Sequence, residues 1–278
     1  MSVRFGILTD LHAVQDPSRR AAWHNAYDFA GVEQRRNRAL ELFAEAGIDR
    51  LLLLGDLAHD GDLPSLRRML RPDGLAAPAL AVGGNHDGAR PTDQLDQARP
   101  KSLTLPGWRA VRHGPVRVAG VRVVRRPERR WAAARRPALA TWGADPVLLA
   151  SHFPLLSRST ALAQRKLPYA GDLIDRAAVA EPLLARPTPT VVACGHLHVR
   201  DSASCGSLLQ LGFGALVEPP FEATLLELAI DGNAVDVTRI AHELGEAHEQ
   251  RDPRLAPARE SWRFEPERGW ERRAQEGP

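Results

Sequence analysis

The first part of the chain alternates short apolar runs with stretches whose apolar residues recur at helical spacing. Residues 3–9, 49–54 and 79–82 are apolar runs of strand length, each followed by polar residues or glycine. Residues 32–46 have the spacing of a helix that ends at Gly47, and residues 63–70 predict a second, shorter helix. This order of strands and helices is typical of an α/β domain, in which parallel strands are buried on both faces.

The pattern changes after residue 88. Residues 116–124 predict short strands around a tight turn, 146–150 and 190–194 predict buried strands, and 172–185 predict a helix. Two further runs, 223–230 and 234–240, flank Asp231-Gly232-Asn233, which is a strong β-hairpin signal. The sequence contains no internal repeat.

The last segment differs in composition from the rest. We expect a catalytic domain over residues 1–241 and a charged extension over 242–278 that is rich in Arg, Glu and Pro. Trp262, Phe264 and Trp270 are isolated apolar anchors within it. Two alternatives are open: an arm that packs on the body or on a second subunit, or a partly disordered tail.

Composition excludes several classes of protein. The chain has 278 residues, of which 44% are hydrophobic and 26% charged, as in ordinary globular domains. No apolar run approaches the roughly 20 residues of a membrane span, and the first residues lack a signal-peptide pattern. We therefore expect a cytoplasmic protein without a membrane partner. Cys194 and Cys205 fit neither a disulfide framework nor a zinc pattern, and Cys194 is expected to be a buried, inert thiol.

Positive charge is concentrated in one segment. Ten arginines and one acid, Glu128, lie between Arg109 and Arg136, although the whole chain has a net charge of only +3. Such a patch suits an anionic partner such as a phosphate ester or a nucleic acid. With 35 Arg and 2 Lys in the chain, coding bias is an alternative explanation. Because Trp131 is the one aromatic residue near the centre of the patch, base stacking is poorly supported and nucleic acid is the weaker expectation.

Polar residues that can bind metal follow five separate apolar runs. In chain order they are Asp10 and His12, then Asp56, then Asn85, His86 and Asp87, then His152, and finally His196 and His198. Ligand sites in α/β sheets gather beyond the carboxyl ends of the strands, so we expect these groups to meet there. Imidazole, carboxylate and amide donors without thiolates suit manganese, iron or zinc. The preceding Gly83 and Gly84 allow the backbone to approach a crowded site.

These motifs closely resemble those of the calcineurin-like metallophosphoesterase superfamily. Its blocks D-x-H, G-D, G-N-H-D/E, H and G-H-x-H stand here in order between Asp10 and His198. The resemblance implies a four-layer α-β-β-α sandwich with two central mixed β-sheets. It implies two metal ions, with Mn or Fe expected and Zn or Mg possible. The first ion would be held by Asp10, His12, Asp56 and His198, and the second by Asp56, Asn85, His152 and His196.

The resemblance also implies the chemistry. Two metals sharing Asp56 clamp phosphoryl oxygens and lower the pKa of a bridging water, whose hydroxide attacks phosphorus in line with the leaving group. His86 would act near the leaving oxygen as a catalytic residue, and Asp87 would orient the His86 ring. Some relatives lack metal ligands and act as binding scaffolds, but no block is degraded here. We therefore expect a hydrolase acting on a small-molecule phosphate ester. A homo-oligomer is possible.

Departures from known subfamilies refine this expectation. Protein Ser/Thr phosphatases have arginines at the positions that look like Asp60 and Gly83 here, and purple acid phosphatases have a tyrosine where His59 stands. Without those arginines a phosphodiester is favoured over a monoester, and the layout looks most like cyclic-nucleotide phosphodiesterases. A phosphomonoesterase or a repair-type nuclease is the alternative. Two alternatives are open for His59: it reaches a metal itself, or, as the favoured expectation, it lies behind the metal ligands or at the surface. The loop 13–30 is either part of the substrate pocket, through Arg19, Arg20, His24 and Asn25, or an ordinary solvated loop.

Overall fold

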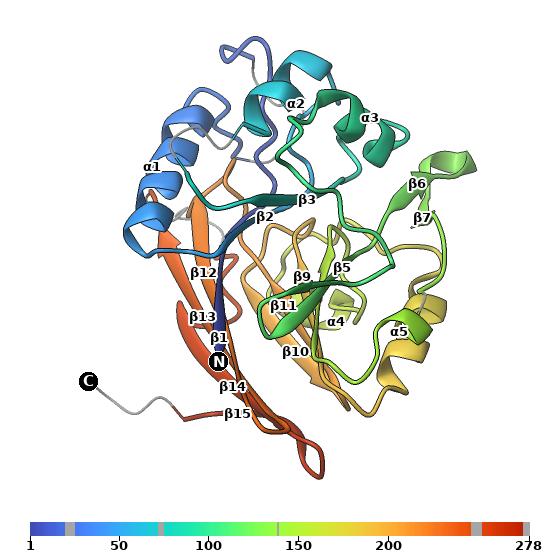
Figure 1. The fold of residues 1–278 in the computed structure, drawn as a ribbon. Helices are drawn as coiled ribbons and strands as arrows, with labels where there is room; N and C mark the ends of the chain where they lie inside the picture. The colour runs from blue at the N-terminus through green and yellow to red at the C-terminus, as the bar shows by residue number, and fades with distance from the viewer. Residues whose placement is uncertain (20–25, 72–74, 138, 246–251, 275–278) are drawn as a thin grey trace.

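Two mixed β-sheets lie face to face in the computed structural model, which describes residues 1–19, 26–71, 75–137, 139–245 and 252–274 (Figure 1). The first sheet has seven strands in the order β15-β14-β13-β12-β1-β2-β3, and the second has six in the order β10-β11-β9-β8-β5-β4. A separate two-stranded ribbon pairs β6 with β7. The first-sheet strands are β1 (Ser2–Leu8), β2 (Arg50–Leu54), β3 (Ala79–Val82), β12 (Glu222–Asp231), β13 (Ala234–Glu243), β14 (Arg259–Glu265) and β15 (Gly269–Arg272).

The remaining elements complete four layers. The other strands are β4 (Val111–His113), β5 (Val116–Gly120), β6 (Val123–Arg125), β7 (Trp131–Ala133), β8 (Val147–Ser151), β9 (Thr190–Cys194), β10 (Asp201–Cys205) and β11 (Leu208–Gly212). The helices are α1 (Val32–Glu45), α2 (Leu63–Met69), α3 (Pro91–Ala98), α4 (Ser159–Gln164) and α5 (Arg176–Leu184), with short 3-10 turns η1 (Pro127–Arg129) and η2 (Leu139–Thr141).

Successive side chains of a strand point to opposite faces of its sheet, and this divides the core into layers. In β2, Leu52 and Leu54 join the cluster between the sheets, whereas Leu51 and Leu53 face the cluster that contains α1 and α2. On the far side, Leu149 of β8 packs in a third cluster with α5. Successive strand side chains point to opposite faces, so a fully apolar strand serves two cores at once. The predicted four-layer α-β-β-α sandwich is confirmed.

Several predicted elements are confirmed in detail. Strands β1, β2 and β3 pair in parallel, and β12 and β13 form the hairpin, with Asp231 opposite Ala234. The short strands predicted in 116–124 are present as β5 and β6 on either side of residues 121–122, although they do not pair with each other: β5 pairs with β4 and β8, and β6 pairs with β7. Cys194 is buried, and burial raises the pKa of its thiol. No helix in the described residues is long and apolar enough to cross a membrane.

Part of the segment expected to be an extension lies at the edge of the first sheet. The predicted boundary after residue 241 falls inside β13, and β14 and β15 pair onto it in turn (Figure 1). Trp262, Phe264 and Trp270 are buried between the sheets. The strand β14 alternates buried and half-buried residues, but its inward positions include the charged Glu260, which pairs with Arg239. That charge hides the strand pattern in the sequence.

Candidate metal centre

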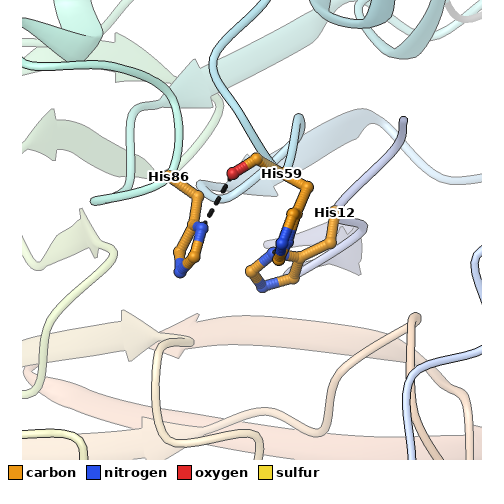
Figure 2. Close-up of side chains that lie close together, drawn as sticks. All are labelled: His12, His59 and His86. Carbon is orange, nitrogen blue, oxygen red and sulfur yellow. Dashed lines mark hydrogen bonds between the residues drawn. The ribbon is translucent and has the colours of Figure 1, made fainter. Parts of the chain in front are cut away.

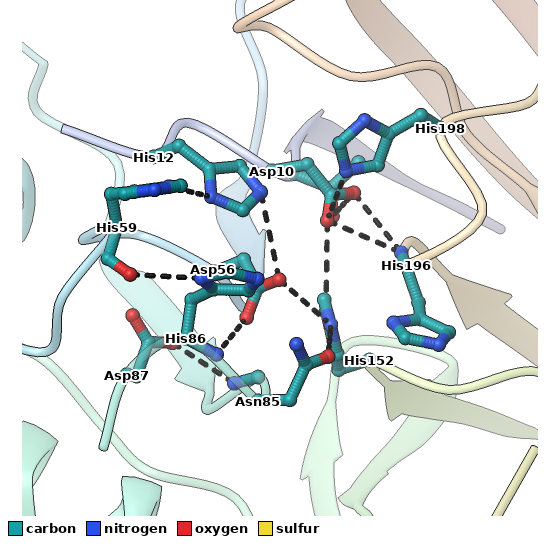
Figure 3. Close-up of polar contacts among 12 residues, drawn as sticks. Asp10, His12, Asp56, His59, Asn85, His86, Asp87, His152, His196 and His198 are labelled. Carbon is teal, nitrogen blue, oxygen red and sulfur yellow. Dashed lines mark hydrogen bonds and ion pairs between the residues drawn. The ribbon is translucent and has the colours of Figure 1, made fainter. Parts of the chain in front are cut away.

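Five strand ends bring the predicted polar residues into one place. The loops after β1, β2 and β3 of the first sheet and after β8 and β9 of the second meet where the two sheets adjoin (Figures 1 and 3). The side chains that gather there are Asp10, His12, Asp56, Asn85, His86, Asp87, His152, His196 and His198. All of them are buried except Asn85 and His86, which are half-buried. All nine residues predicted from the sequence therefore lie in this cluster.

The backbone that presents these side chains is strained. Five of the residues adopt the left-handed region, which costs roughly 1–3 kcal/mol for a residue other than glycine: Asp10 (φ 52), His12 (φ 47), Asp56 (φ 49), His196 (φ 67) and His198 (φ 54). Such strain persists only where neighbouring contacts fix the conformation. Two backbone hydrogen bonds do so here: the amide of Asp10 donates to the carbonyl of Gly55, and that of His12 donates to Asp56.

Two glycines allow the loops to come this close. A Cβ on Gly84 would overlap the Asp56 carboxylate, and one on Gly195 would overlap the hydroxyl of Thr9. Gly83 serves a different purpose, since its Cβ would meet Pro91 at the start of α3. The expected crowding of the site is therefore confirmed for Gly84, while Gly83 makes room for a helix.

Asp56 occupies the middle of the cluster. Its Oδ2 lies 3.6 Å from Nε2 of His12 and 3.3 Å from Nε2 of His152. Its Oδ1 accepts a 2.7 Å hydrogen bond from the backbone amide of His86, which holds the carboxylate in place. One oxygen thus faces ring nitrogens from both sides of the centre.

Asp10 is fixed in a similar way. Its Oδ1 lies 3.3 Å from Nε2 of His198, and its Oδ2 accepts a 2.7 Å hydrogen bond from the hydroxyl of Thr9. Both oxygens also face the backbone amide of His196, at 3.3 and 3.1 Å. Burial alone would raise the pKa of Asp10, but His198 and His152 beside it lower that pKa to about 2. Asp10 is therefore ionised, and its carboxylate oxygens can bind a cation.

The donor atoms of the cluster suit metal ions. Nε2 of His12 and Nε2 of His196 are buried without a hydrogen-bond partner in the described structure, a costly state for a polar atom unless it binds a ligand. Three groups of donors lie within 4.8 Å of one another: Asp10, His12 and His198; Asp10, Asp56 and His152; and His12, His59 and His86. We call the first two of these groups the first and second clusters. Burial lowers the pKa of His12 and brings that of His196 to about 3, so both rings are neutral and can donate lone pairs.

Asn85 and His196 complete the second cluster. Oδ1 of Asn85 lies 3.1 Å from Nε2 of His152, and the His196 ring lies 5.1 Å from the His152 ring between centroids. Asn85 and His196 thus both lie next to His152. The donor atoms of both clusters are nitrogen and oxygen, which hard or borderline divalent ions prefer.

Three outer partners orient the ligand histidines. Nδ1 of His198 is 2.8 Å from Oε1 of Glu218, Nδ1 of His152 is 2.8 Å from the carbonyl oxygen of Leu54, and Nδ1 of His12 is 3.1 Å from Nδ1 of His59. Such contacts fix the tautomer and aim Nε2 at the metal. Sequence reasoning missed Glu218, because it belongs to no motif and reaches His198 only through the fold.

His59 contacts two site histidines at once. Its buried ring stacks on the His86 ring at 4.9 Å between centroids, and its backbone carbonyl oxygen lies 2.8 Å from Nδ1 of His86 (Figure 2). Together with the contact to His12, this places His59 beside the centre rather than on the surface.

The role expected for Asp87 is not the one that the structure shows. Its Oδ1 accepts from the backbone amides of Leu57 and Ala58, and its Oδ2 accepts from that of Gly84. Asp87 therefore ties the loop after β3 to the loop after β2, and the carbonyl of His59 takes its expected place as the partner of His86.

The loop before α1 is described only in part. Arg19 forms an ion pair with Asp60, whereas Arg20, His24 and Asn25 lie outside the described residues. Tyr27, which the sequence did not single out as a site residue, stacks on the His198 ring at 5.6 Å and lies 5.0 Å from the His12 ring.

Comparison with known proteins agrees with this geometry. A family model described as calcineurin-like phosphoesterase matches residues 3–200. No curated protein sequence matches the chain significantly.

Among solved structures, a dimetal phosphatase from Danio rerio is similar at a TM-score of 0.62 and 13% identity, over 87% of this chain and 97% of that one. Purple acid phosphatase PPD1 from yellow lupin has a TM-score of 0.55 at 12% identity, over 89% of this chain and 53% of that one. TT1561 of Thermus thermophilus has a TM-score of 0.51 at 17% identity, over 81% of this chain and 94% of that one. At these identities the structures show a shared fold. The family model spans more than half of the sequence and includes every strand end of the centre, and the chain belongs to the calcineurin-like phosphoesterase family.

Proposed function

We propose that the protein is a binuclear metal-dependent phosphodiesterase that hydrolyses a small-molecule phosphate ester. The observation that carries the proposal is the position of Asp56, whose Oδ2 faces His12 at 3.6 Å and His152 at 3.3 Å. A carboxylate between two sets of donors is suited to bridging two cations. Such a pair supplies neutralisation of phosphoryl oxygens and a coordinated water of lowered pKa.

The ligand sets that we propose for the two ions are those that the family resemblance implies. The first would be held by Asp10, His12, Asp56 and His198, and the second by Asp56, Asn85, His152 and His196. The oxygen and imidazole donors favour manganese or iron, with zinc and magnesium as further candidates.

His86 is the proposed proton donor to the leaving oxygen. Its Nδ1 is held by the carbonyl of His59 at 2.8 Å, which leaves Nε2 as the ring atom that can hold and deliver a proton. His86 is half-buried, while the ligands Asp10, Asp56 and His152 are buried. His86 is therefore more accessible to a substrate than these ligands are.

Charge near the ligands favours a diester. In the described part of the loop before α1, Arg19 lies near the centre. An ion pair with Asp60 neutralises its charge. A phosphomonoester dianion needs more cationic contacts than a diester monoanion. The region around the first cluster thus supports a substrate whose reacting phosphate carries a single charge.

The test compares hydrolysis of bis-p-nitrophenyl phosphate with that of p-nitrophenyl phosphate in manganese, and repeats both with excess chelator. We expect preference for the diester and loss of activity with chelator. Preference for the monoester would identify a phosphatase and overturn the argument from charge. Chelator-resistant hydrolysis would contradict a metal-dependent mechanism altogether.

A further inference from the structure

The segment between Arg122 and Arg136 contains exposed arginines without acidic partners. We call residues 122–136, which include the ribbon β6–β7, the arginine hairpin (Figure 1). Within the described structure none of its arginines lies within ion-pair distance of a carboxylate, whereas the nearby Arg112 and Arg117 both pair with Asp145. Composition bias explains a high number of arginines but not this difference in pairing. The hairpin is therefore a surface with uncompensated positive charge.

A groove of about 750 Å³ runs between the arginine hairpin and the start of α3. Its volume falls within the roughly 300–1,000 Å³ of small-molecule sites. One acid, Asp93, lines it, together with the apolar Trp108 and Val123. The arginines that line it are Arg90, Arg109, Arg122, Arg125, Arg126 and Arg135. Asp93 pairs with Arg90 at 3.9 Å, which leaves the groove with a large excess of positive charge. A concave surface with such an excess concentrates anions, so the groove is suited to an anion.

Two chains of contacts connect the arginine hairpin to the metal centre. On one side, the backbone amide of Arg125 donates a 3.2 Å hydrogen bond to the carbonyl of Ala89, three residues after His86. Three residues span at most about 11 Å. On the other side, the Trp131 ring lies 6.3 Å from the Phe153 ring, which lies 4.2 Å from the ring of His196. The hairpin is thus linked to the centre through residues 86–89 on one side and through Phe153 on the other.

We propose that this groove binds a second, non-reacting phosphate group of the substrate. The proposal rests on the proposed phosphodiesterase activity and narrows its substrate class: the natural substrate carries at least two phosphates. Arginine recognises phosphate through paired N–H donors, and several unpaired guanidiniums within reach of one site supply them without breaking existing ion pairs. A second phosphate can belong to a nucleoside diphosphate ester or to a short oligonucleotide.

The experiment measures KM and kcat for three substrates in the full-length, manganese-loaded protein. Bis-p-nitrophenyl phosphate has one phosphate, diadenosine pyrophosphate has two, and the thymidine trinucleotide TpTpT has two in a nucleic-acid chain. The variant is Arg125→Gln combined with Arg126→Gln. The control is Arg268→Gln, an exposed arginine in the turn between β14 and β15 that pairs with Glu265 and Glu271 and does not line the groove.

We expect the native protein to prefer a two-phosphate substrate over bis-p-nitrophenyl phosphate. In the double variant, KM for that substrate should rise about tenfold or more, since charged hydrogen bonds are lost, while kcat and both constants for bis-p-nitrophenyl phosphate stay nearly unchanged. The control should behave as the native protein. Preference for diadenosine pyrophosphate identifies a nucleoside diphosphate ester, and preference for TpTpT identifies an oligonucleotide.

Two outcomes would overturn the subsite. One is a native protein that gains nothing from a second phosphate. The other is a double variant that loses activity equally on all three substrates. Either result can occur while chelator-sensitive hydrolysis of bis-p-nitrophenyl phosphate persists, so failure of the subsite is distinguishable from failure of the phosphodiesterase activity.

Discussion

The two ligand clusters of the centre differ in what orients their histidines. In the first cluster, side chains do so: His59 contacts His12, and Glu218 contacts His198. In the second, Nδ1 of His152 is held by the backbone carbonyl of Leu54 in β2. One side of the centre thus depends on two particular side chains, and the other depends on the sheet itself.

This difference indicates where a substitution can change metal affinity. A backbone carbonyl within a strand is present whatever the side chain, so the orientation of His152 is built into the fold. The orientations of His12 and His198 can be changed by replacing one outer residue each. Metal affinity should therefore vary more readily at the first cluster than at the second.

The largest expected effect comes from removing a ligand of the second cluster. His152→Ala takes away an imidazole beside both Asp56 and Asn85, so the second ion should be lost along with most of the activity. Metal analysis of the purified variant should find about one ion per chain. Two bound ions with native turnover would contradict the ligand set.

His86→Ala separates catalysis from metal binding. The ring is not assigned to either ion, so both should stay bound while kcat falls about 10²–10⁴-fold, the usual contribution of a general acid. Steady-state kinetics together with metal analysis on the same preparation provide the check. A rate equal to that of the native protein would remove the proposed role.

His59→Ala tests the side-chain support of the first cluster. Loss of the ring contact to His12 should weaken binding of one ion about 10–100-fold, as is usual for outer partners of metal ligands. The carbonyl that holds His86 is retained, so kcat at saturating metal should change far less than in His86→Ala. His113→Ala, at a half-buried histidine of β4, is the matched control.

Glu218→Gln is expected to have the smallest effect. The amide keeps the size of the side chain and an oxygen that can still accept from Nδ1 of His198, but it removes the charge. Metal affinity at the first cluster should fall by about tenfold or less. Titration calorimetry with manganese measures the change. An equal loss of affinity for both ions would contradict the difference that we infer between the clusters.

The site could be predicted from the sequence where a metal-binding motif directly follows a strand pattern. Each ligand follows an apolar run, so strand ends and metal-binding motifs could be predicted together, as for Asp56 after β2. Glu218 and the partners of Asp87 could not be predicted, because those contacts join segments that no local pattern relates. The strand β14 was missed for another reason: its inward Glu260 is compensated by Arg239 of β13, a pairing that exists only after the sheet has formed.

The centre joins the two sheets of the sandwich. Asp10, Asp56 and Asn85 come from the first sheet, and His152, His196 and His198 come from the second. Ions bound to residues of both sheets bind the native state and not the unfolded chain, so they stabilise it by mass action, about 2.7 kcal/mol at a hundredfold excess over Kd. We therefore expect the thermal stability of this protein to rise with the metal concentration around it.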